Sequence, residues 1–305
     1  MTDTKLYMIV TAKNMNDSVA RSLQAACERL GVQCERIVTD TTILADVPTM
    51  QFDEGSLLYR VSTSGKAAII EAMFMQLNPA RLTTIYSPSW SLISDRRSHK
   101  FSGSVAGGLR IIPTILLDET WKRFTKEEVS NRVEKIGGFP LIVKTLGLSH
   151  GRGVVKVDSL QDLMGYLSDM PTDDYNTILR KYLADYRHYR IIVVDGAIAA
   201  AIEYHKPDND FRTNASEEPM VSSVAADSLP EDIRQLAIDS VALRSSILGG
   251  VDILVDTSND TGYLAEVNIP CNYARAEGPT GIDISSKILQ AMMRKRQEKM
   301  QDSVA

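Results

Sequence analysis

The first part of the chain alternates short apolar runs with amphipathic segments. Apolar runs predict strands, and segments whose apolar residues recur every three or four positions predict helices. The predicted strands are residues 6–12, 32–38, 56–61 and 81–86, and the predicted helices are 17–30 and 66–77. Strands that alternate with helices imply parallel pairing, so residues 1–93 are expected to form a small open α/β domain.

Beyond residue 112 the pattern changes to paired strands with separate helices. Turn residues predict hairpins between 139–144 and 154–157, between 190–194 and 197–204, and between 251–256 and 263–268, and a further strand is expected at 176–182. Helices are expected at 126–136, 159–167, 229–248 and 281–299. This grouping indicates an α+β region, which we divide into subdomains 94–175 and 176–305.

The last predicted hairpin gathers acidic and amide side chains on one face. Glu266 and Asn268 are two residues apart on a strand, so they point the same way, and Asp252 reaches that face if the hairpin pairs in register. Such oxygen ligands suit Mg²⁺, which fills its remaining positions with water and nucleotide phosphates. The pattern predicts a metal site; the alternative is the solvated outer face of a hairpin.

A lysine at the end of a predicted strand precedes a glycine-containing loop. Lys144 ends the strand 139–144, and the following loop holds Ser149, Gly151 and Gly153. Glycines let backbone N–H groups approach phosphate oxygens, and the lysine ammonium adds positive charge. The loop therefore suits a lid over phosphates, although glycine hairpins also occur without ligands.

Arg60 stands near the end of the predicted strand 56–61. Ligands of parallel sheets bind at the carboxyl ends of strands. Arg60 is therefore a candidate for binding a carboxylate or phosphate, and an arginine that caps a surface loop is the alternative.

Composition narrows the class of protein. The 305 residues are 44% hydrophobic and 24% charged, with a net charge of −5, which disfavours a nucleic-acid partner. No apolar run is long enough to span a bilayer and the first residues lack a signal-peptide pattern, so we expect a cytoplasmic protein. Cys27, Cys34 and Cys271 lack metal spacing and are expected to be free thiols. A homo-oligomeric state is left open.

The order of the motifs resembles the ATP-grasp superfamily, and within it the RimK-like glutamate and amino-acid ligases. The resemblance covers residues 94–289. It rests on Lys144 and on five motifs that follow in order: SHGRGV at 149–154, DFRTN at 210–214, GVDIL at 250–254, EVN at 266–268 and TGIDIS at 280–285. It implies a Rossmann-like pre-ATP-grasp domain followed by two ATP-grasp subdomains that clamp ATP. The implied reaction joins a small-molecule or peptide carboxylate to an amino-acid amine, with ATP converted to ADP and phosphate.

The resemblance also implies roles for individual residues. Lys144 and Arg96 would contact phosphates, and the loop with Ser149, Gly151 and Gly153 would close over them. Asp252, Glu266 and Asn268 would hold two Mg²⁺ ions, with Mn²⁺ as an alternative, and Arg212 and Asn214 would meet the phosphates and metal. Arg60 and Arg190 would serve the acid substrate and the acyl phosphate. The hinge that reads adenine would be Arg180, Lys181, Tyr182 and Leu183.

The chain departs from the family pattern at the nucleotide site. Lys181 stands where a glutamate is usual, Arg96 replaces a common lysine, and His188 aligns with the acidic residue that holds the ribose. We therefore expect the nearby Asp185 to accept the ribose hydrogen bonds; the alternative is a solvated loop aspartate. Two other functions remain open: a nucleotide-binding regulatory protein without turnover, and a kinase-like enzyme that releases a phosphorylated product.

Overall fold

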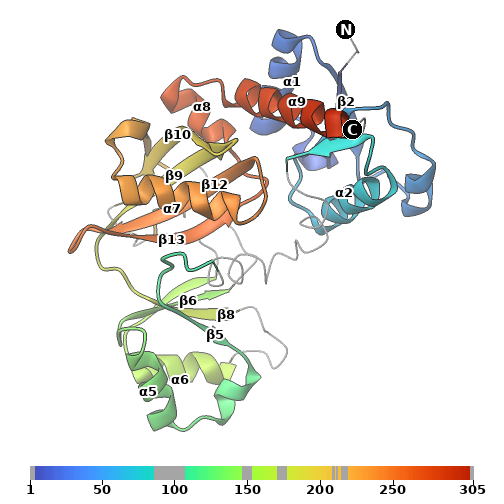
Figure 1. The fold of residues 1–305 in the computed structure, drawn as a ribbon. Helices are drawn as coiled ribbons and strands as arrows, with labels where there is room; N and C mark the ends of the chain where they lie inside the picture. Colours follow the sequence, from blue (N-terminus) through green and yellow to red (C-terminus); the bar gives the residue numbers. More distant parts are fainter. Residues whose placement is uncertain are drawn as a thin grey trace.

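The computed structural model describes residues 4–85, 107–145, 153–169, 177–207, 210, 212–213 and 219–302, and within this part the strands form three sheets. Figure 1 shows the three sheets in separate parts of the molecule, and the sheet that contains β5, β6 and β8 lies farthest from the chain termini. No helix in the described ranges is both long enough and apolar enough to cross a bilayer.

The N-terminal sheet is parallel, as the sequence predicts, with strand order β2-β1-β3-β4. Its strands are β1 (Lys5–Val10), β2 (Gln33–Val38), β3 (Ser56–Arg60) and β4 (Leu82–Thr84). Because side chains alternate along β1, Leu6, Met8 and Val10 share a core with α1 (Ser18–Leu30), whereas Tyr7 and Ile9 pack in a second core with α2 (Gly65–Leu77). Helices therefore cover both faces of this sheet.

The central sheet has the order β5-β8-β6-β7 and antiparallel pairs. It consists of β5 (Thr114–Leu117), β6 (Leu141–Thr145), β7 (Val154–Val157) and β8 (Thr177–Lys181), and α5 (Lys126–Glu134) and α6 (Leu160–Asp169) cover one face. Leu141 and Val143 face these helices, so Ile142 and Lys144 point to the opposite face. The expected boundary at residue 176 is displaced, because β8 pairs with β5 and β6; the other domain limits stay predictions.

The C-terminal sheet has the order β11-β10-β9-β12-β13. Its strands are β9 (Tyr186–Val194), β10 (Ala197–Tyr204), β11 (Val221–Val224), β12 (Leu248–Asp256) and β13 (Thr261–Asn268). One face packs on α7 (Glu231–Ala242) through Ile191, Val193 and Val251. The opposite face of β9 is apolar at Ile192 and Val194 and polar at His188 and Arg190, so the same strand serves a core and a pocket.

The expected helix 229–248 is too long. The helix ends at Ala242, the backbone turns through Ser245 with a φ of 47°, and Leu248 opens β12 instead. The expected helix 281–299 is present as α9 (Ile284–Asp302), which begins three residues later. A short helix that was not expected, α8 (Ala274–Thr280), precedes it and ends before Gly281.

A single hydrophobic core joins the N-terminal and C-terminal sheets. It contains Leu6 and Met8 of β1, Ile192 of β9, and Ile288 and Leu289 of α9. In Figure 1, α9 runs beside α1, next to the N-terminal sheet. The described residues of the core beneath the central sheet all lie between 115 and 179, so that sheet has a core of its own.

Candidate functional site

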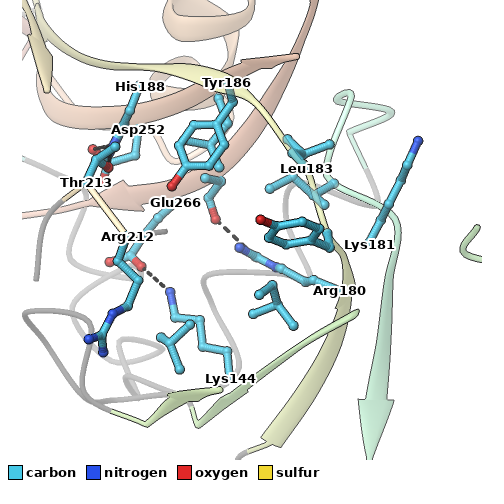
Figure 2. Close-up of a pocket in the computed structure, with 16 residues that line it drawn as sticks. Lys144, Arg180, Lys181, Leu183, Tyr186, His188, Arg212, Thr213, Asp252 and Glu266 are labelled. Carbon is cyan, nitrogen blue, oxygen red and sulfur yellow. Dashed lines mark hydrogen bonds and ion pairs between the residues drawn. The ribbon is translucent and has the colours of Figure 1, made fainter. Parts of the chain in front are cut away.

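A pocket lies between the central sheet and the C-terminal sheet, and Figure 2 shows side chains from both sheets pointing into it. The central sheet and its flanks contribute Ile112, Ile142, Lys144, Val154 and Arg180; the hinge contributes Lys181, Tyr182 and Leu183; the C-terminal part contributes Tyr186, His188, Arg212, Thr213, Asp252, Leu254, Ala265 and Glu266. Apolar and charged side chains therefore share one pocket, as ligand sites commonly require.

Lys144 and Glu266 meet across the pocket from opposite sheets. The Lys144 Nζ atom donates a hydrogen bond to Oε2 of Glu266 at 3.0 Å, and both side chains remain about one-fifth exposed. Figure 2 shows the two side chains extended toward each other from the two walls. The predicted phosphate-contacting lysine and the predicted metal-binding glutamate are thus neighbours.

Asp252 lies opposite Glu266 in the β12–β13 register, which confirms that the hairpin places the two residues side by side. Arg190, its neighbour on β9, donates two hydrogen bonds to the Asp252 carboxylate, from Nε to Oδ1 at 2.6 Å and from Nη2 to Oδ2 at 2.8 Å. Asn268 Nδ2 donates to Oδ2 at 3.2 Å, and His188 Nε2 lies 3.1 Å from Oδ1. Asp252 is 5% exposed and has partners on both carboxylate oxygens.

The charges of this cluster determine the protonation of Asp252. Burial alone would raise the pKa of its carboxyl, but the positive charge of Arg190 and the hydrogen bond with His188 outweigh burial and hold the pKa below its usual value. Burial likewise opposes the charge on Arg190, and the charge of Asp252 outweighs it, so the pKa of Arg190 is raised. Asp252 is therefore an anion at neutral pH and Arg190 a cation.

Arg180 bridges the two sheets at the hinge. Its Nη2 atom donates to the backbone oxygen of Ala265 at 3.0 Å, as Figure 2 shows. Burial lowers the pKa of Arg180 to about 10, which leaves the guanidinium charged at neutral pH. Lys181, Tyr182 and Leu183 follow it along the pocket, so the four expected hinge residues are brought together there.

His188 lies in the pocket between Thr213 and Asp252. Its Nδ1 atom lies 2.5 Å from the Thr213 hydroxyl, and its ring packs against Tyr204 with the centroids 4.8 Å apart. Thr213 and Tyr186 line the pocket but were not expected from the sequence. Thr213 lies inside the DFRTN motif, so the motif could have identified it as a pocket residue. No sequence motif marks Tyr186.

Other expected site residues have different surroundings. Arg212 lines the pocket and pairs with Asp210, its Nη2 atom 2.7 Å from Oδ2. Asp185 is outside the pocket lining, and its carboxylate accepts a hydrogen bond from the Thr257 hydroxyl at 3.0 Å. Gly153 has a φ of 68°, and its carbonyl accepts from the Thr145 N–H.

Arg60 lies in the N-terminal sheet and is buried. It donates to Glu71 at 2.6 Å and to the backbone oxygen of Ser62 at 2.9 Å, so its guanidinium has partners within the protein. Four expected site residues, Arg96, Ser149, Gly151 and Asn214, lie outside the described residues.

Cys271 is buried beside Arg190, and burial raises the pKa of its thiol to about 12. A thiol with that pKa is protonated at neutral pH, and thiolate chemistry requires the anion. Cys271 is therefore a packing residue.

The donor set fits a hard divalent cation. Asp252, Glu266 and Asn268 offer two carboxylates and an amide oxygen from adjacent strands, which is the ligand chemistry of Mg²⁺. Within the described ranges, His, Cys, Asp and Glu alone form no metal-binding group of three. An ion would consequently need Asn268, water or a bound phosphate to complete its shell.

Comparison with known proteins identifies the family. A model of the RimK-like ATP-grasp domain matches residues 113–292, more than half of the chain. A probable alpha-L-glutamate ligase of Shewanella pealeana is 27% identical over 191 residues, 61% of this chain and 41% of the relative. The ribosomal protein bS6–L-glutamate ligase of Escherichia coli O81 is 28% identical over 165 residues, 53% of each chain. The matched region thus spans about half of these relatives or less.

Solved structures share the fold at low sequence identity. The ATP-grasp ligase PsnB with its minimal precursor aligns with a TM-score of 0.71 at 14% identity, covering 96% of this chain and 99% of that one. D-alanine–D-alanine ligase from Bacillus anthracis, complexed with ATP, aligns with a TM-score of 0.69 at 18% identity, covering 98% and 100%. This chain has the mixed α/β ATP-grasp fold and belongs to the RimK-like ATP-grasp family.

Proposed function

We propose that the protein is an ATP-dependent ligase that joins a carboxylate to an amine through an acyl phosphate and releases ADP and phosphate. The observation that carries the proposal is the meeting of Lys144 and Glu266 across the pocket, in a chain of the RimK-like family. One residue is suited to phosphate and the other to a metal ion, and they come from the two sheets between which the nucleotide would lie.

The chemistry of amide formation explains why basic side chains and a metal site are enough for this reaction. A carboxylate resists attack by an amine because its leaving group would be oxide. Transfer of the γ-phosphoryl group of ATP to one carboxylate oxygen gives an acyl phosphate, and the amine then displaces phosphate and loses a proton. The protein has to position the reactants and neutralise charge, which requires cations and not a nucleophilic side chain.

We assign the roles by position. Lys144 and, outside the described residues, Arg96 bind phosphates beneath the lid that includes Gly153, while Arg180, Lys181, Tyr182 and Leu183 hold the base. Asp252, Glu266 and Asn268 hold one or two Mg²⁺ ions. Bound there, the metal would supply positive charge against the phosphates.

The remaining basic and amide residues stay candidates for the reacting groups. Arg190 orients the acyl phosphate, and Arg212 and Asn214, two residues apart in the sequence, meet the phosphates and the metal. For the ribose, Asp185 and His188 both stay candidates: Asp185 lies outside the pocket lining, and His188 lines the pocket with its two ring nitrogens next to Thr213 and Asp252. Arg60 stays a candidate for the acid substrate only if it leaves Glu71.

The relatives suggest the substrate class. One is named for adding glutamate to a ribosomal protein, and a structural neighbour is complexed with a precursor peptide. We propose an amino acid, with glutamate first, as the amine and a peptide or small molecule as the acid. A cytoplasmic location agrees with the supply of ATP and with three free cysteines.

Product analysis tests the proposal. Purified protein is incubated with ATP, Mg²⁺ and pairs from panels of amino acids and acids, ADP is measured, and the products are weighed by mass spectrometry. ADP with an amide product supports a ligase. ADP with a stable phosphorylated product indicates a kinase-like enzyme, and nucleotide binding without ADP indicates a regulatory protein.

A further inference from the structure

Both carboxylates that we assign to the metal ion already face a basic side chain of this protein. Arg190 pairs with Asp252 through two hydrogen bonds, and Lys144 pairs with Glu266. The two pairs lie next to each other, because Asp252 and Glu266 are opposite residues in the β12–β13 register. A role for these pairs in metal binding rests on the proposed function, since both concern the same site.

The Asp252 carboxylate has no vacant position among its described contacts. Oδ1 meets Arg190 Nε and His188 Nε2, and Oδ2 meets Arg190 Nη2 and Asn268 Nδ2. A carboxylate has about four lone-pair sites, so these contacts use all of them. A metal ion can bind Asp252 only by replacing a donor, and Arg190 supplies two of the four together with a full positive charge.

We propose that Arg190 excludes metal from Asp252 in the nucleotide-free protein, and that the metal enters only together with the nucleotide. A cation that approaches Asp252 meets the charge of Arg190, and at Glu266 it meets that of Lys144. The nucleotide phosphates are the anions that can receive the displaced basic side chains. Metal and nucleotide therefore bind cooperatively, and by linkage each strengthens the other by the same factor.

Mn²⁺ binding to the nucleotide-free protein, measured from the electron paramagnetic resonance signal of free Mn²⁺, tests this directly and needs no turnover. The test variant is Arg190→Met, which keeps an apolar stem and removes the charge. The control is Arg187→Met on the same strand, because Arg187 also forms a doubly hydrogen-bonded pair, with Glu203, but is exposed and outside the pocket lining. Both variants lose one positive charge, so only position differs.

We expect Arg190→Met to bind Mn²⁺ at least about tenfold more tightly than the wild type without nucleotide, and Arg187→Met to match the wild type. Adding the non-hydrolysable analogue AMPPNP should tighten Mn²⁺ binding to the wild type by a similar factor and to Arg190→Met by less. Equal Mn²⁺ affinities for Arg190→Met and the wild type without nucleotide would overturn the proposal.

A second variant keeps the test decisive if Arg190→Met does not fold, as judged by circular dichroism. Lys144→Met removes the half-buried partner of Glu266, and Lys156→Met on β7, whose lysine pairs with Asp158, is its control. Tighter Mn²⁺ binding in Lys144→Met alone supports the proposal, and no difference between the two overturns it. If the wild type releases ADP but the variants bind Mn²⁺ as the wild type does, this inference is rejected and the proposed ligase function is not. If the variants show the expected Mn²⁺ affinities but no ADP is released, only the ligase function is rejected.

Discussion

The Asp252 side chain is buried, and both of its carboxylate oxygens accept hydrogen bonds. These two features determine how much Asp252 contributes to stability. Removing one partner of a buried ion pair leaves the other charge desolvated and unpaired, which is the costly case. Its partner Arg190 is also largely buried, so the pair has little access to water that could compensate.

Asp252→Asn is expected to lower the free energy of unfolding by about 3–5 kcal/mol at pH 7, because it leaves Arg190 buried without a counter-ion. Since the folded-state pKa of Asp252 lies below the unfolded value of about 3.9, the stabilisation is complete above that pH and is lost as the pH falls through the folded-state pKa. Urea unfolding at pH 7 and at pH 3 measures both effects.

Asp195→Asn is the matched control, because Asp195 pairs with Arg294 at an exposed site and its φ of 53° suits asparagine. Its cost should stay below about 1 kcal/mol. A difference between wild type and Asp252→Asn that does not shrink at acidic pH would contradict the assignment of stability to the ion pair.

Glu266→Gln should reduce ADP release at least tenfold, about 1.4 kcal/mol of activation barrier, while unfolding stays cooperative. A neutral amide cannot neutralise metal charge, although it keeps the shape of the side chain. Glu203→Gln, which changes a glutamate paired with Arg187 outside the pocket lining, should retain activity. More than a tenth of the wild-type rate in Glu266→Gln would reject the metal role.

At the scale of elements, the alternation of side chains along strands was readable from the sequence, and pairing between distant strands was not. Because strand side chains alternate between faces, Glu266 and Asn268 were predicted to lie on one face. The register of the hairpin places Asp252 next to them. Arg190 was named only by resemblance, because no local pattern says that β9 pairs with β12 and sets Arg190 opposite Asp252. For the same reason β8 was recognised as a strand, but its pairing with β5 and β6 across the predicted boundary at residue 176 was not.

Packing of α7 on β12 depends on a glycine. A Cβ atom at Gly249 would overlap the side chain of Val241, whose β-branched χ1 has little freedom to move away. Gly249→Ala should therefore cost about 1–3 kcal/mol, and in the double variant with Val241→Ala the cost should be less than the sum of the two single costs. Denaturant unfolding of the four proteins in the cycle measures this coupling.

Gly165→Ala on α6 is the control for the glycine effect, because, apart from its chain neighbours and the nearby backbone of its own helix, no atom lies within 4 Å of its Cβ position. It should be neutral or stabilising by up to about 1 kcal/mol, since alanine favours helix. Strictly additive costs for Gly249→Ala and Val241→Ala would show that the two residues do not compete for space.

For the whole molecule, the shared core makes the N-terminal sheet and the C-terminal sheet one packing unit, with α9 between them. The sequence indicated the α/β and α+β classes, and it did not show that their sheets share a core. Apolar periodicity identifies which face of a helix is buried and not which sheet it is buried against. The central sheet, with its own core, meets this unit at the pocket.

Leu289→Ala on α9 tests this organisation. Leu289 is fully buried in the shared core, so the change should cost about 2–5 kcal/mol. Hydrogen exchange followed by mass spectrometry should show lower protection in β1 and in β9 together, with β6 less affected. Loss of protection restricted to the C-terminal sheet would contradict a common unit.

The central claim is that a carboxylate is activated by phosphoryl transfer from ATP before the amine attacks. The most direct measurement uses the acid found in the product screen, labelled with ¹⁸O in its carboxylate, together with ATP, Mg²⁺ and the amine. Our account predicts one ¹⁸O atom in the released phosphate for each amide formed, and almost none with Glu266→Gln. Amide formation with unlabelled phosphate, or the absence of any ATP-dependent amide with every acid and amine tested, would contradict it.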